Sequence, residues 1–282
     1  MNRLRVFFMV LSLVMASAAG AWAAAPQRII TVGGAVTEIV YALGAEDLIV
    51  GSDTTSYFPP AAAKLPKVGY MRALSAEGIL SLRPDLLIVT EDAGPPPVLH
   101  QLDTAGVRML RLKSGRSVAD VEASIRRLAK VLERVSEGAE LLAKLTRDKA
   151  TLSRMVVGGG KSQRVMFILQ HGGGAPMVAG GGTAADGIIR LSGAENAVAG
   201  YGGYKPLTPE AAVALRPDAI LITDQGLKQA GGRDALLAVP GLALTPAGRH
   251  GRVYSMDALL LLGFGPRTVE AAMALNRMYH EQ

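Results

Sequence analysis

The sequence has no cysteine among its 282 residues, so the chain can form neither a disulfide nor the lipid-modified cysteine that anchors many exported bacterial proteins. Aromatic residues make up only 5% of the chain, and no basic run is interleaved with them. Lysine and arginine are scattered along the sequence, although the formal net charge is +6. This distribution argues against nucleic acid as a partner.

The sequence also lacks a hydrophobic run that could span a membrane. The apolar run Val6–Met15 falls short of the ~20 residues that a spanning helix needs. Two arginines precede this run and small residues follow it, which is the pattern of a secretory signal peptide. We expect residues 1–24 to be removed by cleavage near Ala23 or Ala24. Since no cysteine is available for a lipid, we expect a protein that is free in the periplasm.

Catalytic motifs are absent as well. There is no Gly-x-Ser-x-Gly elbow, His-Glu-x-x-His motif or clustered acid pair. Gly158–Ser162 resembles a phosphate-binding loop, but that loop needs glycine where Met155 stands. Gly180–Ala185 lacks the acidic residue of a dinucleotide site, and four scattered histidines do not form a zinc or manganese site. We expect a binding protein, with an exported nucleotide-using enzyme as the alternative class.

What the sequence does contain is a repeated segment. Val68–Thr90 reads VGYMRALSAEGILSLRPDLLIVT, and its core returns in Leu207–Thr223 as LTPEAAVALRPDAILIT. The copies lie too far apart for a solenoid, whose period is roughly 20 to 50 residues. The repeat therefore predicts two lobes of similar build, at residues 25–116 and 158–282.

Within each lobe, apolar runs alternate with helical patterns, which predicts an α/β fold with parallel sheets. Strands are expected at 28–32, 48–50, 86–90, 107–112, 164–169 and 253–255. Helices are expected at 37–43, after the N-cap Ser75, after the prolines at 95–97, and at 268–279.

Residues 117–157 show a different pattern. Apolar residues recur at helical spacing between charged ones, without a proline. This predicts one long helix that links the lobes, with a break near Gly138. An ordinary pair of surface helices is the alternative.

A tyrosine and a cation precede the shared core of each copy, as Tyr70 with Arg72 and Tyr204 with Lys205. A ferric ion prefers a hard anionic oxygen, and a neighbouring guanidinium favours an ionised phenol. Tyrosine is a known ligand of haem iron. Our hypothesis is that the two openings face one another across a cleft, where Tyr70 binds iron. The spacing alone is more typical of a loop tyrosine with a hydrogen-bonded hydroxyl.

Three segments together resemble the periplasmic haem-binding proteins of bacterial ABC haem-uptake systems. They are Gly69–Asp85, Gly203–Leu207 and Met256–Thr268, and the last contains Gly-Phe-Gly-Pro-Arg. The resemblance covers essentially the whole mature chain. It implies the class III periplasmic binding protein fold, with two Rossmann-like lobes, one long linking helix and haem between the lobes. A binding protein of the same fold for ferric siderophores or cobalamin is the alternative.

The resemblance also implies roles for single residues. Tyr70 matches the iron ligand, and Arg72 matches an arginine that supports the tyrosinate or the haem propionates. Met71, Tyr204 and Lys205 are expected to contact the haem. The implied cargo is haem b, passed to an ABC permease and its ATPase by a monomer that an outer-membrane haem receptor supplies indirectly.

His171, in a glycine-rich loop, is a candidate second haem ligand, because some proteins of this family are thought to use a histidine there. A solvated histidine fits the sequence equally well. Glu77 and Glu210 hold the same place in the two repeat copies. As first-turn acids they complement the helix dipole, and the resemblance implies that they also dock the permease.

Overall fold

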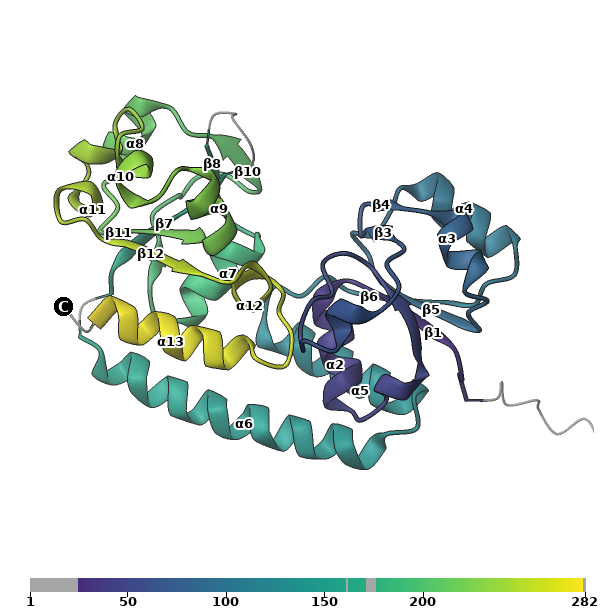
Figure 1. Ribbon diagram of the computed structural model, residues 1–282. Coiled ribbons are helices and arrows are strands. Elements are labelled where there is room, and N and C mark those ends of the chain that lie inside the picture. Colours follow the sequence, from purple (N-terminus) through teal and green to yellow (C-terminus); the bar gives the residue numbers. More distant parts are fainter. Residues whose placement is uncertain (1–24, 161, 171–175, 281–282) are drawn as a thin grey trace, which may run out of the picture.

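The computed structural model describes residues 25–160, 162–170 and 176–280. These residues form two α/β lobes that stand side by side above a long helix (Figure 1). The predicted fold class is therefore confirmed. The expected signal peptide, residues 1–24, lies outside the described residues. Among the helices described, none is long and apolar enough to cross a membrane.

The first lobe is built on a four-stranded parallel sheet in the order β2-β1-β5-β6. Side chains of β5 alternate between two cores: Ile88 packs on one side, and Leu87 and Val89 pack on the other. Because both faces are covered, the central strands are nearly continuous apolar runs. The strands are β1 (Ile29–Val32), β2 (Ile49–Ser52), β5 (Leu86–Thr90) and β6 (Met109–Leu112), and the helices are α2 (Gly34–Ala42), α3 (Ala76–Ser81), α4 (Pro96–Thr104) and α5 (Val118–Val131).

The second lobe has a mixed sheet in the order β10-β8-β7-β11-β12, with β9 pairing with β7. An all-parallel sheet was expected here, but β8 and β10 run antiparallel. The connection from β7 to β8 is shorter than the dozen residues that a parallel crossover needs. The strands are β7 (Arg164–Leu169), β8 (Met177–Ala179), β9 (Glu195–Asn196), β10 (Tyr204–Pro206), β11 (Ala219–Thr223) and β12 (Val253–Met256).

Short helices surround this second sheet. They are α7 (Ala184–Leu191), α8 (Pro209–Leu215), α9 (Asp224–Gln229), α10 (Arg233–Leu237), α11 (Pro246–Arg249), α12 (Ala258–Leu262) and the closing α13 (Thr268–His280). The described residues also form three single 3-10 turns, at Glu46–Leu48, Ala62–Lys64 and Leu242–Leu244.

The repeated Arg-Pro-Asp segment has the same structural role in both lobes. Arg83 and Arg216 adopt left-handed φ angles of 46° and 45° just after α3 and α8, and the following proline prevents the helix from continuing. The Asp85 carboxylate accepts the backbone N–H of Arg28 at 3.1 Å, and Asp218 accepts that of Arg164 at 3.0 Å. Each copy thus ends a helix and anchors the start of a central strand.

The predicted single helix over residues 117–157 is wrong, since the segment forms α5 and a separate α6 (Val135–Gly158). The break lies at Glu133, which has a left-handed φ of 56°, and not near Gly138. A Cβ at Gly138 would lie 2.5 Å from the Cβ of Ala129, so this glycine lets α6 approach α5 closely. The alternative of a helix pair is the correct one, and α6 alone runs beneath both lobes (Figure 1).

The two lobes are tied together at their base by polar contacts. The Arg267 guanidinium donates two hydrogen bonds to the carboxylate of Glu38, whose exposed fraction is 5%, and it stacks 3.6 Å from the Phe58 ring centroid. The Tyr57 hydroxyl donates to the Asp257 carboxylate at 2.9 Å and accepts the Leu259 N–H at 2.9 Å. These contacts join segments that are far apart in the sequence.

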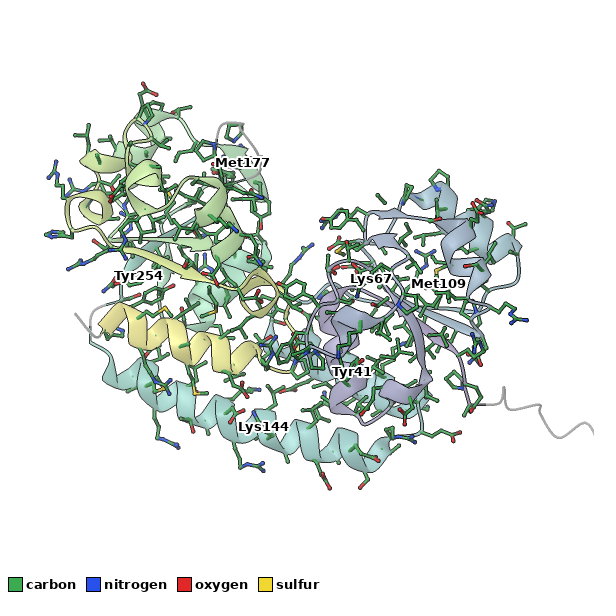
Figure 2. The ribbon with its side chains drawn as sticks, viewed as in Figure 1. Tyr41, Lys67, Met109, Lys144, Met177 and Tyr254 are labelled. Atoms are coloured by element: carbon green, nitrogen blue, oxygen red, sulfur yellow. The ribbon has the colours of Figure 1, made fainter. Side chains whose placement is uncertain are left out.

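Helix α6 is tied to the second lobe in turn. Lys144, labelled on α6 in Figure 2, pairs with Asp148 at 2.7 Å on its own helix and with Glu270 on α13 at 2.5 Å. At the base of the molecule, α6 is therefore connected to α13, and the polar contacts described above connect the two lobes to each other.

Candidate functional site

Tyr70 lies on a small hairpin formed by β3 (Gly69–Tyr70) and β4 (Ala73–Leu74). Gly69 has a φ of 109°, and a Cβ at this position would lie 2.5 Å from the carbonyl oxygen of Ala73. Only glycine fits so tight a hairpin without strain. The hairpin leaves the Tyr70 side chain 44% exposed, an unusual setting for a large aromatic residue.

Arg72 turns back on the hairpin and donates a hydrogen bond to the Tyr70 hydroxyl oxygen at 3.0 Å. A second nitrogen of the same guanidinium lies 3.9 Å from the Asp92 carboxylate, and both of these side chains are partly open to solvent. The pairing of Tyr70 with Arg72 that the sequence suggested is therefore present. With one hydrogen bond accepted, the phenol oxygen keeps a lone pair that can bind a metal ion.

Tyr204 belongs to the second lobe, on strand β10 beside β8. Burial raises the pKa of its half-buried phenol, while the positive charges of Arg72 and Arg116 act in the opposite direction. Arg72 of the first lobe is thus close enough to Tyr204 to influence its ionisation. Figure 1 shows the β3–β4 hairpin and β10 on the facing sides of the two lobes. The structure brings together Tyr70, Arg72 and Tyr204.

Met71 and Lys205 make contacts of their own. Met71 is partly buried against the apolar core beneath the hairpin. The Lys205 ammonium lies 4.4 Å from the centroid of the Tyr201 ring. Since neighbouring side chains on a strand point to opposite faces, Lys205 turns away from the face that carries Tyr204.

Glu77 and Glu210 lie in the first turns of α3 and α8, beside the capping residues Ser75 and Thr208. Both are exposed, and neither forms an ion pair within the part of the chain that the structure describes. Figure 1 places α3 and α8 on the outer parts of the two lobes, at the end that carries the hairpin and β10. His171 lies outside the described residues.

Arg116 is the site residue that the sequence reasoning missed. It precedes the N-cap Ser117 of α5, in the segment that passes from β6 to α5 between the lobes. The Ser-x-x-Asp pattern at Ser117–Asp120 could have marked this helix start, but no local pattern indicates that Arg116 influences Tyr204.

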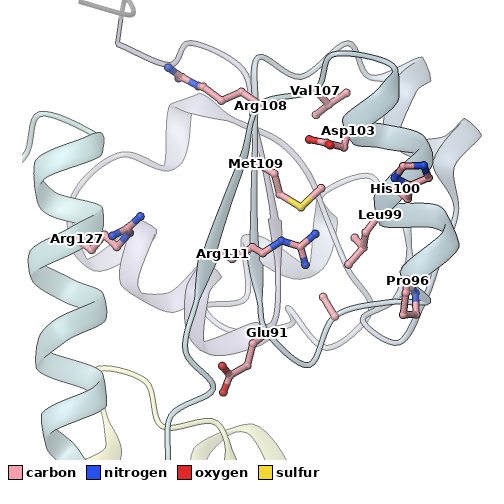
Figure 3. Close-up of a pocket in the computed structure, with 11 residues that line it drawn as sticks. Glu91, Pro96, Leu99, His100, Asp103, Val107, Arg108, Met109, Arg111 and Arg127 are labelled. Carbon is pink, nitrogen blue, oxygen red and sulfur yellow. The ribbon is translucent and has the colours of Figure 1, made fainter.

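A groove of about 820 Å³ lies elsewhere, between α4 and the edge strand β6 (Figure 3). None of the predicted ligand residues lines this groove. Its lining comes nearest to them in sequence at Glu91, which precedes Asp92, the partner of Arg72. The lining residues are Glu91, Ala93, Pro96, Leu99, His100, Asp103, Val107, Arg108, Met109, Arg111 and Arg127. Over the described ranges no group of three or more His, Asp or Glu residues is arranged to hold a metal ion.

Several solved structures are similar to the chain over nearly its whole length. The periplasmic heme-binding protein BhuT in complex with two hemes is 47% identical, with a TM-score of 0.86 over 90% of this chain and 98% of that one. The periplasmic heme-binding protein RhuT from Roseiflexus sp. RS-1, in apo form, is 40% identical, with a TM-score of 0.87 over 90% and 98%.

Curated relatives are more distant. An uncharacterized ABC transporter substrate-binding lipoprotein, YvrC of Bacillus subtilis, is 29% identical over 89% of this chain and 79% of its own length. A vitamin B12-binding protein of Pectobacterium carotovorum is 30% identical over 61% of this chain and 62% of its own length. The family described as periplasmic binding protein matches residues 29–260. The chain therefore belongs to this family of substrate carriers, which confirms the expectation of a binding protein and not an enzyme.

Proposed function

We propose that the protein binds haem between its two lobes and delivers it to an ABC permease. The observation that carries the proposal is the exposed Tyr70 phenol, which accepts a hydrogen bond from Arg72 on a surface facing Tyr204. The similarity to heme-binding proteins over 90% of the chain supports the same cargo.

In this proposal Tyr70 is the axial ligand of the ferric iron of haem b. When iron displaces the phenol proton, the Arg72 guanidinium is already in place to share the charge of the phenolate. The half-buried Tyr204 and the thioether of Met71 offer apolar surface to the porphyrin. Burial of that surface, at about 25 cal/mol per Å², supplies most of the affinity.

The proposal of haem delivery also assigns the transport partners. Residues 25–116 and 158–282 are the two lobes, and Glu77 and Glu210 each dock one of them on the permease, whose ATPase drives uptake. The protein acts as a periplasmic monomer after cleavage near Ala23 or Ala24. His171 is the candidate ligand for a second haem, and Lys205 a weaker candidate contact.

Titration with hemin tests the proposal. The wild-type protein is expected to give the absorption spectrum of tyrosinate-ligated ferric haem, and Tyr70→Phe is expected to lose it. Tyr41→Phe is a matched control, because Tyr41 lies on α2 in the lower part of the first lobe (Figure 2). A Tyr70→Phe protein that keeps the wild-type spectrum would overturn the assignment.

Cobalamin is the second candidate cargo, because vitamin B12-binding proteins are among the relatives. A cobalamin carrier would not need a phenol at position 70. Competition separates the two: cyanocobalamin is expected to leave bound hemin in place. Displacement of hemin by equimolar cyanocobalamin would favour cobalamin as the cargo.

A further inference from the structure

The segment that carries Arg116 is held firmly between the lobes. A Cβ at Gly115 would lie 2.6 Å from the Cβ of Phe264, and a Cβ at Gly187 would lie 2.3 Å from the carbonyl oxygen of Arg116. Both glycines let the chain pass in direct contact with Phe264 and α7. The backbone of Arg116 is thus fixed from the side of the second lobe.

The same backbone is fixed from the side of the first lobe. The Arg116 N–H donates to the Asp120 carboxylate at 3.1 Å, and the same carboxylate also accepts from the Ser117 hydroxyl at 2.7 Å. The Lys113 ammonium pairs with Asp120 at 2.8 Å. Asp120 therefore has its own cation, and the Arg116 guanidinium is not needed to neutralise it.

Whereas the Arg116 backbone is closely packed, its side chain is open to solvent. It is exposed, and no carboxylate of the described chain lies within ion-pairing distance of it. Its segment runs against Phe264 and Gly187 of the second lobe, and its positive charge, like that of Arg72, acts against the raised pKa of Tyr204. The cations nearby are already engaged: Arg72 by Tyr70 and Asp92, and Lys113 by Asp120.

An arginine with a fixed backbone and a free guanidinium suits the recognition of a carboxylate. The guanidinium is planar and offers two parallel N–H donors to the two oxygens of one carboxylate. Fixing the backbone in advance reduces the entropy lost when the ligand binds.

We propose that Arg116 binds a carboxylate of the cargo between the lobes, and that this carboxylate is a haem propionate. The inference rests on the proposed function, because it assigns a residue to the recognition of the same ligand. Arg116 thereby selects porphyrins that carry free carboxylates, whereas Tyr70 selects the metal.

The test compares two ligands on two variants. Arg116→Gln is expected to weaken hemin binding about 10-fold, the loss that corresponds to one charged hydrogen-bonded contact, and to leave the affinity for hemin dimethyl ester unchanged. The tyrosinate spectrum should persist in Arg116→Gln, since Tyr70 is untouched. Arg127→Gln is the matched control: Arg127 is an exposed arginine on the body of α5, and its substitution should change neither affinity.

The possible outcomes separate this inference from the proposed function. If wild type binds hemin through Tyr70 but Arg116→Gln binds it equally well, the inference fails and the proposed function stands. If Arg116→Gln loses equal affinity for hemin and for the ester, the residue has a structural role and the inference fails. If wild type does not bind hemin, both fail.

Discussion

The base and the rim of the inter-lobe region differ in whether their polar side chains are paired and buried or exposed to solvent. At the base, Glu38 and Arg267 satisfy one another in a nearly closed setting, as do Tyr57 and Asp257. At the rim, which carries the β3–β4 hairpin, Tyr70 is exposed and Arg72 pairs with its hydroxyl and with Asp92 near solvent. The base therefore holds the lobes together, whereas the rim keeps its polar groups available for a ligand.

Tyr70 and Tyr204, which hold corresponding places in the two repeat copies, also differ in how far their phenol groups are buried. Burial raises the pKa of Tyr204, so this phenol stays protonated at neutral pH and offers a ring surface. Tyr70 instead presents its oxygen beside a guanidinium. Tyrosines at equivalent positions of the repeat thus have different environments. Of the two, only the environment of Tyr70 suits metal binding.

The largest expected effect is on stability, at the base. Arg267→Ala leaves Glu38 buried without its partner and is expected to lower the free energy of unfolding by about 3 kcal/mol. Urea unfolding measures this loss. The double variant Glu38→Gln/Arg267→Ala should lose less than the sum of the single variants, because no unpaired charge remains. Equal stability of wild type and Arg267→Ala would show that the base does not join the lobes.

The next effect is on binding, at the rim. Tyr70→Phe removes the iron ligand and is expected to weaken hemin binding by about 100-fold, or about 2.7 kcal/mol. Its unfolding free energy should change by less than about 0.5 kcal/mol, since the hydroxyl is exposed. Hemin titration and urea unfolding on the same preparation check both values. A loss of stability with unchanged affinity would mean that Tyr70 supports the fold, as the base does, and does not bind the cargo.

A smaller effect should appear at alkaline pH. Burial raises the pKa of Tyr57 to about 12, above the usual value near 10. The folded state thus keeps the proton longer than the unfolded state, so this stabilisation is complete below pH 10 and is lost as pH rises through about 12. We expect wild type to lose about 2 kcal/mol more than Tyr57→Phe over this range. Parallel pH profiles of the two proteins would contradict this.

The smallest effect concerns the second tyrosine. Tyr204→Phe keeps the ring and removes a phenol that does not bind iron, so hemin affinity should fall by less than about threefold, or about 0.6 kcal/mol. Absorbance titration with hemin measures the change. A loss as large as that of Tyr70→Phe would mean that both tyrosines bind the metal.

Release of the cargo depends on the base as well. The Glu38–Arg267 contact joins the two lobes, and helix α6, which the pair of Lys144 and Glu270 fixes to α13, runs beneath both of them (Figure 1). We expect little spontaneous opening, so that a permease docked on both lobes must draw them apart.

The fold was largely predictable because its signals are local. The central strands are short apolar runs between turn residues, and Ser75 accepts the Gly78 N–H as the capping pattern predicts. The break at Glu133 was missed because a left-handed turn at glutamate has no glycine or proline to mark it. Gly138 suggested a break but instead serves close packing against Ala129.

The site was predictable only in part. Tyr70 and Arg72 are two residues apart, so a hairpin was sufficient to pair them. The contact of Glu38 with Arg267 joins positions 229 residues apart, and no periodicity indicates such a pair. Arg116 reaches the site because its segment packs on Phe264 and Gly187, which depends on how the lobes associate.

A crystal structure of the hemin complex is the most direct test of the account. It should show the iron bound by the Tyr70 oxygen, with the porphyrin between the hairpin and β10. Iron held by another side chain, or a porphyrin seated in the groove between α4 and β6, would contradict it.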